Sequence, residues 1–164
     1  MGKPNVIVQF DITEYINRFM DNSTKQSLGS AVVDEAKSMI ASGQSPVKGN
    51  GRFQGYSDSY LKAIRDRLNA SDGKTVRPVN LNLSGKMLDA YGYRANSNSV
   101  TVGIMTATNS IENEIAGYHN DGTDKMPQRQ LVPKEGEEWA VKIMRVIKEI
   151  YSDRLNDIIK QSNK

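Results

Sequence analysis

The alternation of apolar and polar residues predicts that the chain begins with a short strand followed by two helices. In 6–10, apolar residues recur with the two-residue period of a strand. In 12–20 and again in 28–40 they recur every three or four positions, which is the period of a helix. Asp11 and Ser23 are each followed three residues later by Glu or Gln, a pattern that favours a helix N-cap at both positions.

The pattern of the second half predicts a small sheet with short helices, and then one long amphipathic helix. The expected strands are 76–83, 91–95, 100–104 and 129–132, and the expected helices are 57–68, 85–90, 109–119 and 134–161. The apolar side chains expected along the last two helices are Ile111, Ile115 and Tyr118, and then Trp139, Ile143, Val146, Ile147, Ile150 and Ile158. The fold class is therefore α+β: N-terminal helices, a small mainly antiparallel sheet with short helices, and a long C-terminal helix.

One stretch between these elements contains too many helix and strand breakers to form a regular element. Five glycines and prolines lie within 42–56. We expect a long exposed loop at about 43–56 within a single domain, 1–164. Long loops in compact domains are usually functional or disordered, so this loop is expected to order only when it meets a partner.

Composition narrows the classes of function. No apolar run approaches the roughly 18 residues that span a membrane, and the N-terminus lacks the pattern of a signal peptide. The absence of cysteine excludes disulfides, thiolate zinc sites and a cysteine nucleophile, so an intracellular origin is expected. The net charge is +3, but 46–77 alone holds seven basic and three acidic residues. That segment is either a solvated face or a surface for a polyanion.

The stretch AGYHNDGTDKMPQR, 116–129, contains the only histidine of the chain. His119 lacks a partner nucleophile in any recognised motif, and with Asp121 and Asp124 it makes an incomplete metal set. A structural corner explains more: the imidazole lies at a helix C-terminus, and Asn120 and Gly122 adopt left-handed conformations. Arg129 is then expected to pair with a carboxylate.

A nucleic-acid-binding function remains open from the residues alone. The segment 52–77 combines basic residues with Phe53, Tyr56 and Tyr60, but it has no ribonucleoprotein signature, zinc finger or helix-turn-helix. Sequence-specific readout is therefore disfavoured. Contact with phosphates without base readout stays as the alternative function, a basic non-sequence-specific nucleic-acid-binding module.

The order of short motifs along the chain carries a resemblance to a known family. Ser-Pro-x-x-Gly-x-x-Arg-Phe (45–53) precedes Leu-x-x-Ser-Gly-x-Met-Leu (81–88) and Val-Thr-Val-Gly (100–103). His-Asn-x-Gly-Thr (119–123) and Met-Pro-x-Arg (126–129) follow, and then the long helix. In this order they resemble the tail-completion and virion-morphogenesis proteins of tailed bacteriophages, which are small neck or tail-terminator subunits. Where that family often continues Pro-x-Arg with proline and an aromatic residue, this chain has Gln130 and Leu131.

The resemblance implies a structural virion protein of the head–tail junction and not an enzyme, with no cofactor and no metal. It implies self-association into a ring, expected to be hexameric. The ring is expected to assemble in the host cytoplasm and to bind connector or neck and tail-tube proteins in the virion. Non-specific contact with DNA in the channel is a further expectation, and no membrane partner is expected. The candidate assembly-interface residues are Arg52, Phe53, Tyr56, Tyr60, His119, Arg129 and Trp139.

Overall fold

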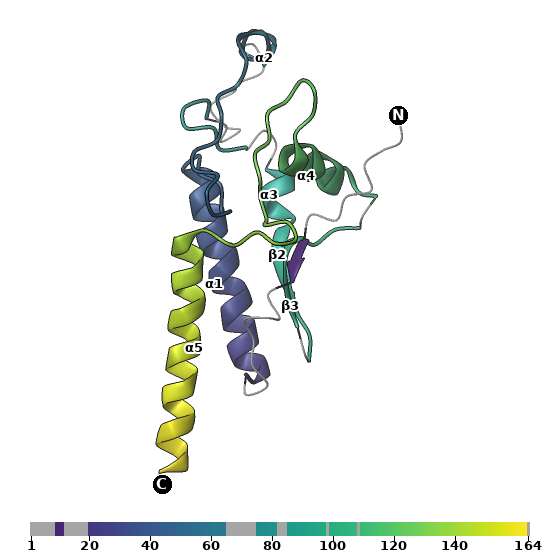
Figure 1. Ribbon diagram of the computed structural model, residues 1–164. Coiled ribbons are helices and arrows are strands. Elements are labelled where there is room, and N and C mark those ends of the chain that lie inside the picture. The colour runs from purple at the N-terminus through teal and green to yellow at the C-terminus, as the bar shows by residue number, and fades with distance from the viewer. Residues whose placement is uncertain are drawn as a thin grey trace.

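The computed structural model describes residues 9–11, 20–64, 75–81, 85–97, 99–107 and 109–163. The elements in chain order are β1 (Gln9–Asp11), α1 (Asn22–Ala41), α2 (Asp58–Ile64), α3 (Lys86–Asp89), β2 (Tyr91–Ala95), β3 (Val100–Ile104), α4 (Ile111–Asp121) and α5 (Val141–Ser162). Figure 1 shows α1 between the sheet and α5, with α2, α3 and α4 gathered at one end. The expected α+β class is confirmed.

The sheet is antiparallel and has the strand order β1-β3-β2. The hairpin expected at 91–95 and 100–104 is confirmed, with Tyr91 opposite Ile104 and Ala95 opposite Val100. On the other side of β3, Gln9 of β1 pairs with Gly103. The sheet packs on α1 closely enough that a Cβ at Gly29 would lie 2.3 Å from the ring of Tyr93, so only glycine fits at this position.

Helix α1 buries the face that its apolar period predicts. Leu28, Val32 and Ile40 are inaccessible to solvent, and the helix ends before Gly43, whose φ of +76° few other residues adopt. The cap lies two residues earlier than expected, because the Asp21 carboxylate, and not the Ser23 side chain, accepts the amide N–H of Thr24 at 2.8 Å. The hydrogen bonds that the amide and the hydroxyl of Thr24 donate to this carboxylate are the largest cause of a lowered pKa for Asp21.

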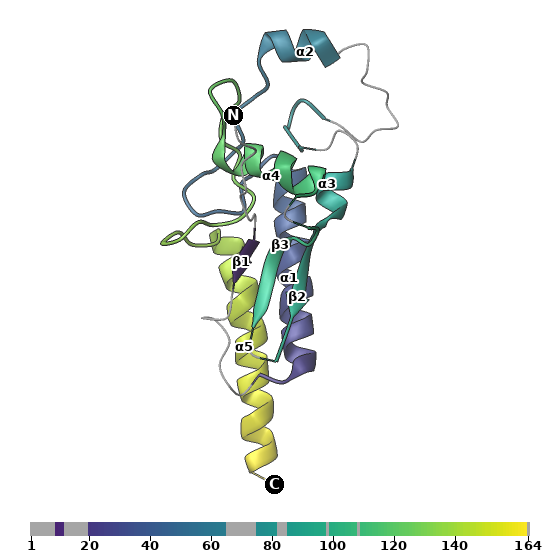
Figure 2. The same ribbon diagram turned by 90° about the vertical axis from the view of Figure 1, so that its right-hand side faces the viewer.

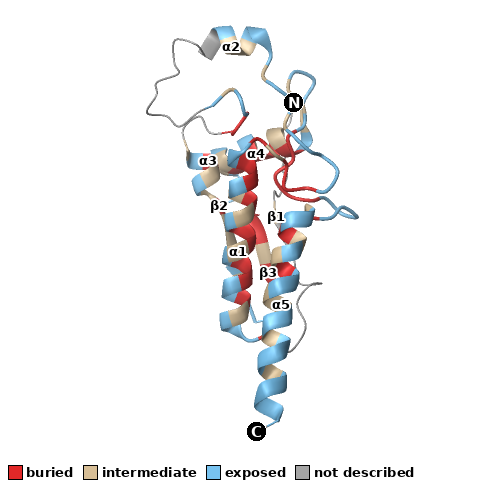
Figure 3. Cartoon of the chain, turned by 90° about the vertical axis from the view of Figure 1, so that its left-hand side faces the viewer, coloured by how far each residue is buried: buried red, intermediate tan, exposed pale blue. Residues whose placement is uncertain are grey.

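Helix α5 begins at Val141, later than the expected start at 134. The preceding residues are held instead by the backbone of the 46–48 segment: Ala140 donates to the Pro46 carbonyl at 2.7 Å, and Lys48 donates to the Glu138 carbonyl at 2.9 Å. Of the expected apolar stripe, Ile143 and Ile147 are buried against the core. The last turns of α5 extend past the N-terminal end of α1 (Figure 1), and they are mostly exposed (Figure 3).

Three expectations about regular elements are wrong or lie outside the described residues. Residues 75–81 form a turn in which Val76 bridges to Val79, so the strand expected at 76–83 is absent from its described part. The segment 129–132 is irregular, because side chains rather than a neighbouring strand bind its backbone. Asp11 ends β1, and the helix expected at 12–20 falls mostly in 12–19, outside the described residues.

The loop expected to be exposed over 43–56 is buried along its first part. Ser45 and Val47 are only 3% and 2% exposed, and Val47 bridges to Trp139. The loop folds back on itself through hydrogen bonds from Ser45 to the Gly51 carbonyl and from Phe53 to the Gly43 carbonyl. The exposed residues of the loop are 48–52, 54 and 55. The carbonyl of Pro46 and the amide of Lys48 bind the segment before α5, so the first part of the loop is fixed against the body of the protein.

A candidate docking groove at the α4 end

An apolar groove of about 580 Å³ is lined by residues of α2, α3 and α4 and of the chain around them. Figure 2 shows these three helices toward the same end of the molecule. The walls of the groove come from segments far apart in the sequence: the start of α2, the turn and helix at α3, the outer face of α4, and the chain that follows α4. The apolar and aromatic residues that line it are Tyr56, Tyr60, Leu81, Met87, Leu88, Ile111, Ile115, Met126 and Pro127. The groove is therefore a concave apolar surface open to solvent.

Helix α4 supplies the exposed wall of the groove with its apolar side chains. Ile111 and Ile115, two of the three apolar residues expected along this helix, are 64% and 40% exposed. The buried residues of α4 are small or polar, namely Asn113, Ala116, Gly117 and Asn120. Ser110, rather than Asn109, caps the helix by accepting the amide N–H of Asn113 at 3.2 Å. The burial of the polar Asn120 is tolerated because its side chain binds the chain that packs beside it.

Asn120 is the residue that fixes the chain after α4. Its Oδ1 accepts the backbone N–H of Leu131 at 2.9 Å and that of Val132 at 3.2 Å, and all three residues are buried. We expected Asn120 to leave the helix in a left-handed conformation, but it stays within α4. Gly122 alone reverses the chain, with a φ of +73° and Gln128 so close that a Cβ would lie 3.0 Å from its amide nitrogen.

Replacing Asn120 with alanine is expected to lower the free energy of unfolding by about 2 kcal/mol, because two buried N–H groups lose their acceptor. Chemical denaturation monitored by circular dichroism measures this loss. Asp124→Ala, in the exposed turn between Thr123 and Met126, is the control and should leave stability unchanged. Equal stability of the two variants would show that Asn120 does not hold the segment after α4.

Arg129 lies beneath the groove and organises its aromatic wall. The residue is 2% exposed, and its guanidinium donates to the carbonyls of Gln54 at 3.0 Å and Gly55 at 3.1 Å. Its Cζ lies 4.9 Å from the centre of the Tyr56 ring, a cation–π geometry, and that ring lies 5.0 Å from the ring of Tyr60. The prediction that Arg129 pairs with a carboxylate is wrong within the described residues, because backbone carbonyls and an aromatic face contact its guanidinium instead.

Burial also shifts the titration of this pair. Desolvation lowers the pKa of Arg129 and raises the pKa of Tyr56, while the charge of Arg129 partly opposes the latter shift. Arg129 stays charged despite this shift, because the ordinary pKa of arginine lies far above neutral, and the raised pKa keeps the Tyr56 phenol neutral near pH 7. The cation is held under the groove, where it orients a neutral phenol and its ring.

The structure brings four of the seven candidate interface residues together. Tyr56, Tyr60, His119 and Arg129 all line the groove, although they come from two stretches about 60 residues apart in the chain. Arg129 is 2% exposed, so it supports the wall of the groove from beneath, and its place at an assembly interface stays a prediction. Ile111, Ile115 and Met87 were missed as groove residues because an apolar helical period does not say whether it faces a core or a binding surface.

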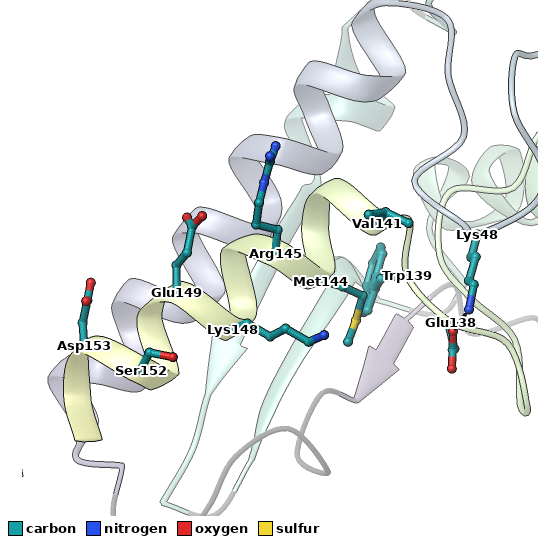
Figure 4. A pocket seen from close by; sticks show the side chains of 10 residues that line it. All are labelled: Lys48, Glu138, Trp139, Val141, Met144, Arg145, Lys148, Glu149, Ser152 and Asp153. Atoms are coloured by element: carbon teal, nitrogen blue, oxygen red, sulfur yellow. Dashed lines mark hydrogen bonds and ion pairs between the residues drawn. The ribbon is translucent and has the colours of Figure 1, made fainter. Parts of the chain in front are cut away.

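The remaining candidates lie elsewhere. Arg52 is exposed and Phe53 is half-buried, and both line a smaller hollow of about 110 Å³ next to Arg129. Trp139 is fully buried before α5, where it packs in the core, and its expected place at an assembly interface stays a prediction. Figure 4 shows the open hollow along α5 beside it, in which Arg145, Glu149 and Asp153 extend from one side of the helix. That hollow mixes both signs of charge and includes an ion pair between Lys48 and Glu138.

Neither a metal site nor a membrane-spanning helix is present in the part of the chain that the structure describes. There, no group of three or more His, Asp or Glu side chains is placed to hold a metal ion. Within the same residues, every helix is too short or too polar to cross a bilayer. Comparisons of the chain with protein-family models, with curated proteins and with solved structures gave no match.

Proposed function

We propose that this chain is a structural, non-catalytic subunit of the head–tail junction of a tailed bacteriophage, and that it forms a ring that completes the tail or joins it to the head. The observation that carries the proposal is the apolar groove at the α4 end. Four residues that the motif resemblance marked as interface candidates converge on it. The groove also exposes Ile111 and Ile115, which a subunit that works alone has no reason to leave in water.

The shape of the groove fits docking of a protein segment better than catalysis. Its walls are apolar and aromatic, its cation is buried and engaged by carbonyls, and its exposed charged groups are Lys86 and Lys125 at the rim. Concave apolar surfaces with few polar groups at the edge are typical of grooves that accept a helix or an extended peptide. In a ring, each subunit presents such a groove to its neighbour or to the adjoining ring.

Replacing both Ile111 and Ile115 with glutamate is expected to abolish self-association while the subunit stays folded. Both side chains are exposed, so the free energy of unfolding changes little, whereas two carboxylates in the groove oppose burial by a partner. Negative-stain images and sedimentation of the purified protein provide the measurement: rings for the wild type and monomers for the variant. Val141→Glu, at a 74% exposed apolar residue outside the groove, is the matched control and should still form rings.

A second function is favoured by one observation, the exposure of Arg52, Lys62 and Arg77 within the basic segment 46–77. A module that binds nucleic acid through phosphates would use these side chains without reading bases. The same purified protein separates the two functions. Monomers that retain random DNA at low salt and release it as salt rises support nucleic-acid binding, and rings in the absence of DNA support the junction subunit.

A further inference from the structure

The protruding end of α5 carries an apolar stripe that the core of its own subunit leaves exposed. Leu155 and Ile159 are 36% and 55% exposed, and Ile158 beside them is half-buried. The ion pair between Arg154 and Asp21, at 2.9 Å, marks the level at which α5 passes the start of α1. Beyond that level, Figure 2 shows α5 continuing away from the body.

The groove and this stripe lie at opposite ends of the molecule. Figures 1 and 2 place α3 and α4 at one end and the C-terminal turns of α5 at the other. One subunit therefore cannot fill its own groove with its own α5. A second copy, placed head to tail, brings the convex stripe to the concave groove.

We infer that the groove of one subunit receives the C-terminal turns of α5 from a neighbouring copy. This inference names the occupant of the groove in the proposed ring and rests on that function. Leu155, Ile158 and Ile159 have the spacing of anchors in an amphipathic helix that binds an apolar groove. The volume of about 580 Å³ accommodates the few large aliphatic side chains that these turns present.

The charges at the proposed contact also favour entry of α5 into the groove by its C-terminal turns. Among the described residues that line the groove, the exposed lysines Lys86 and Lys125 outnumber the one acidic residue, Glu112. The C-terminal end of a helix carries partial negative charge on its free carbonyls, and cations near it are stabilising. In the described last turns of α5, the side-chain charges of Asp157 and Lys160 offset each other, so this partial negative charge remains and meets the lysines of the rim.

The contact is heterologous, because two different surfaces of the same chain meet. Heterologous contacts close into a ring when the rotation between neighbours permits it. They also permit a mixing experiment that a two-fold symmetric contact does not. A variant defective in the groove still offers its α5, and a variant defective in α5 still offers its groove.

The test uses full-length Ile111→Glu/Ile115→Glu as the groove variant and Leu155→Glu/Ile159→Glu as the α5 variant. Each variant alone is expected to associate at least a hundredfold more weakly than the wild type, since two large apolar side chains are lost from the contact. Mixed at equal amounts, they should form a dimer and nothing larger, because only one intact groove meets one intact α5. Asn156→Glu, at an exposed residue between the two α5 substitutions, is the matched control and should form rings as the wild type does.

Sedimentation equilibrium distinguishes the outcomes. Rings from the α5 variant, with rings also from the wild type, would overturn the inference and leave the proposed function standing. A mixture that stays monomeric would also overturn it. A wild type that is monomeric at all concentrations would contradict the proposed function itself.

Discussion

Replacing Trp139 with alanine is expected to lower the free energy of unfolding by about 3–5 kcal/mol, the range for removing a large aromatic side chain from a core. Trp139 is fully buried, and its backbone bridges to Val47 in the loop that precedes α2. It therefore packs at the point where the loop, the start of α5 and the core meet. The loss comes from the removed apolar contacts and from the cavity that remains.

Urea denaturation of the purified protein measures this effect. Val141→Ala is the control, because Val141 lies two residues later and is 74% exposed, so its truncation should change stability by less than about 0.5 kcal/mol. A Trp139 variant as stable as this control would mean that the 46–48 segment does not pack against the chain before α5. The order described for that loop would then be wrong.

Replacing Arg129 with leucine is expected to cost about 3 kcal/mol, because two hydrogen bonds from a charged donor are lost together with the stacking on Tyr56. Leucine keeps much of the apolar volume, so the loss reports mainly the guanidinium. Self-association should weaken as well, since Tyr56 loses the cation that orients it in the groove wall. Lysine at 129 should not restore either property, because an ammonium lacks the planar fork that spans two carbonyls.

Arg52→Leu provides the comparison for this second prediction. It removes an arginine from the same loop region, but from an exposed position, so stability should be close to that of the wild type. Denaturation gives the free energy of unfolding, and sedimentation gives the association. If Arg129→Leu proved as stable and as associated as Arg52→Leu, Arg129 would have no part in organising the groove.

The elements that sequence predicts well are those whose signals are local. The hairpin of β2 and β3 follows from strict alternation around a polar turn, and the inward face of α1 follows from an unbroken helical period. The strand expected at 76–83 fails in its described part because the residues from Thr75 to Asn80 bind one another, as when the Asn80 side chain accepts the amide N–H of Thr75. The pattern of apolar residues along the chain does not indicate these hydrogen bonds.

The groove shows what a single sequence leaves undetermined. Its residues Tyr56, Tyr60 and His119 were selected by motif, but nothing in their spacing says that they meet. The apolar period does not reveal the orientation of α4, because the polar residues Asn113 and Asn120 are buried, and Asn120 binds backbone groups of a segment that follows the helix. Only tertiary contacts decide which face of a short amphipathic helix is covered.

The proposed function is tested most directly by electron microscopy of phage particles assembled with the gene for this chain deleted and then complemented. We predict that filled heads and tails of full length accumulate unjoined, and that the wild-type protein restores joining whereas Ile111→Glu/Ile115→Glu does not. Val141→Glu should restore joining as the wild type does. Normal joined particles in the deletion would contradict a role for this protein at the head–tail junction.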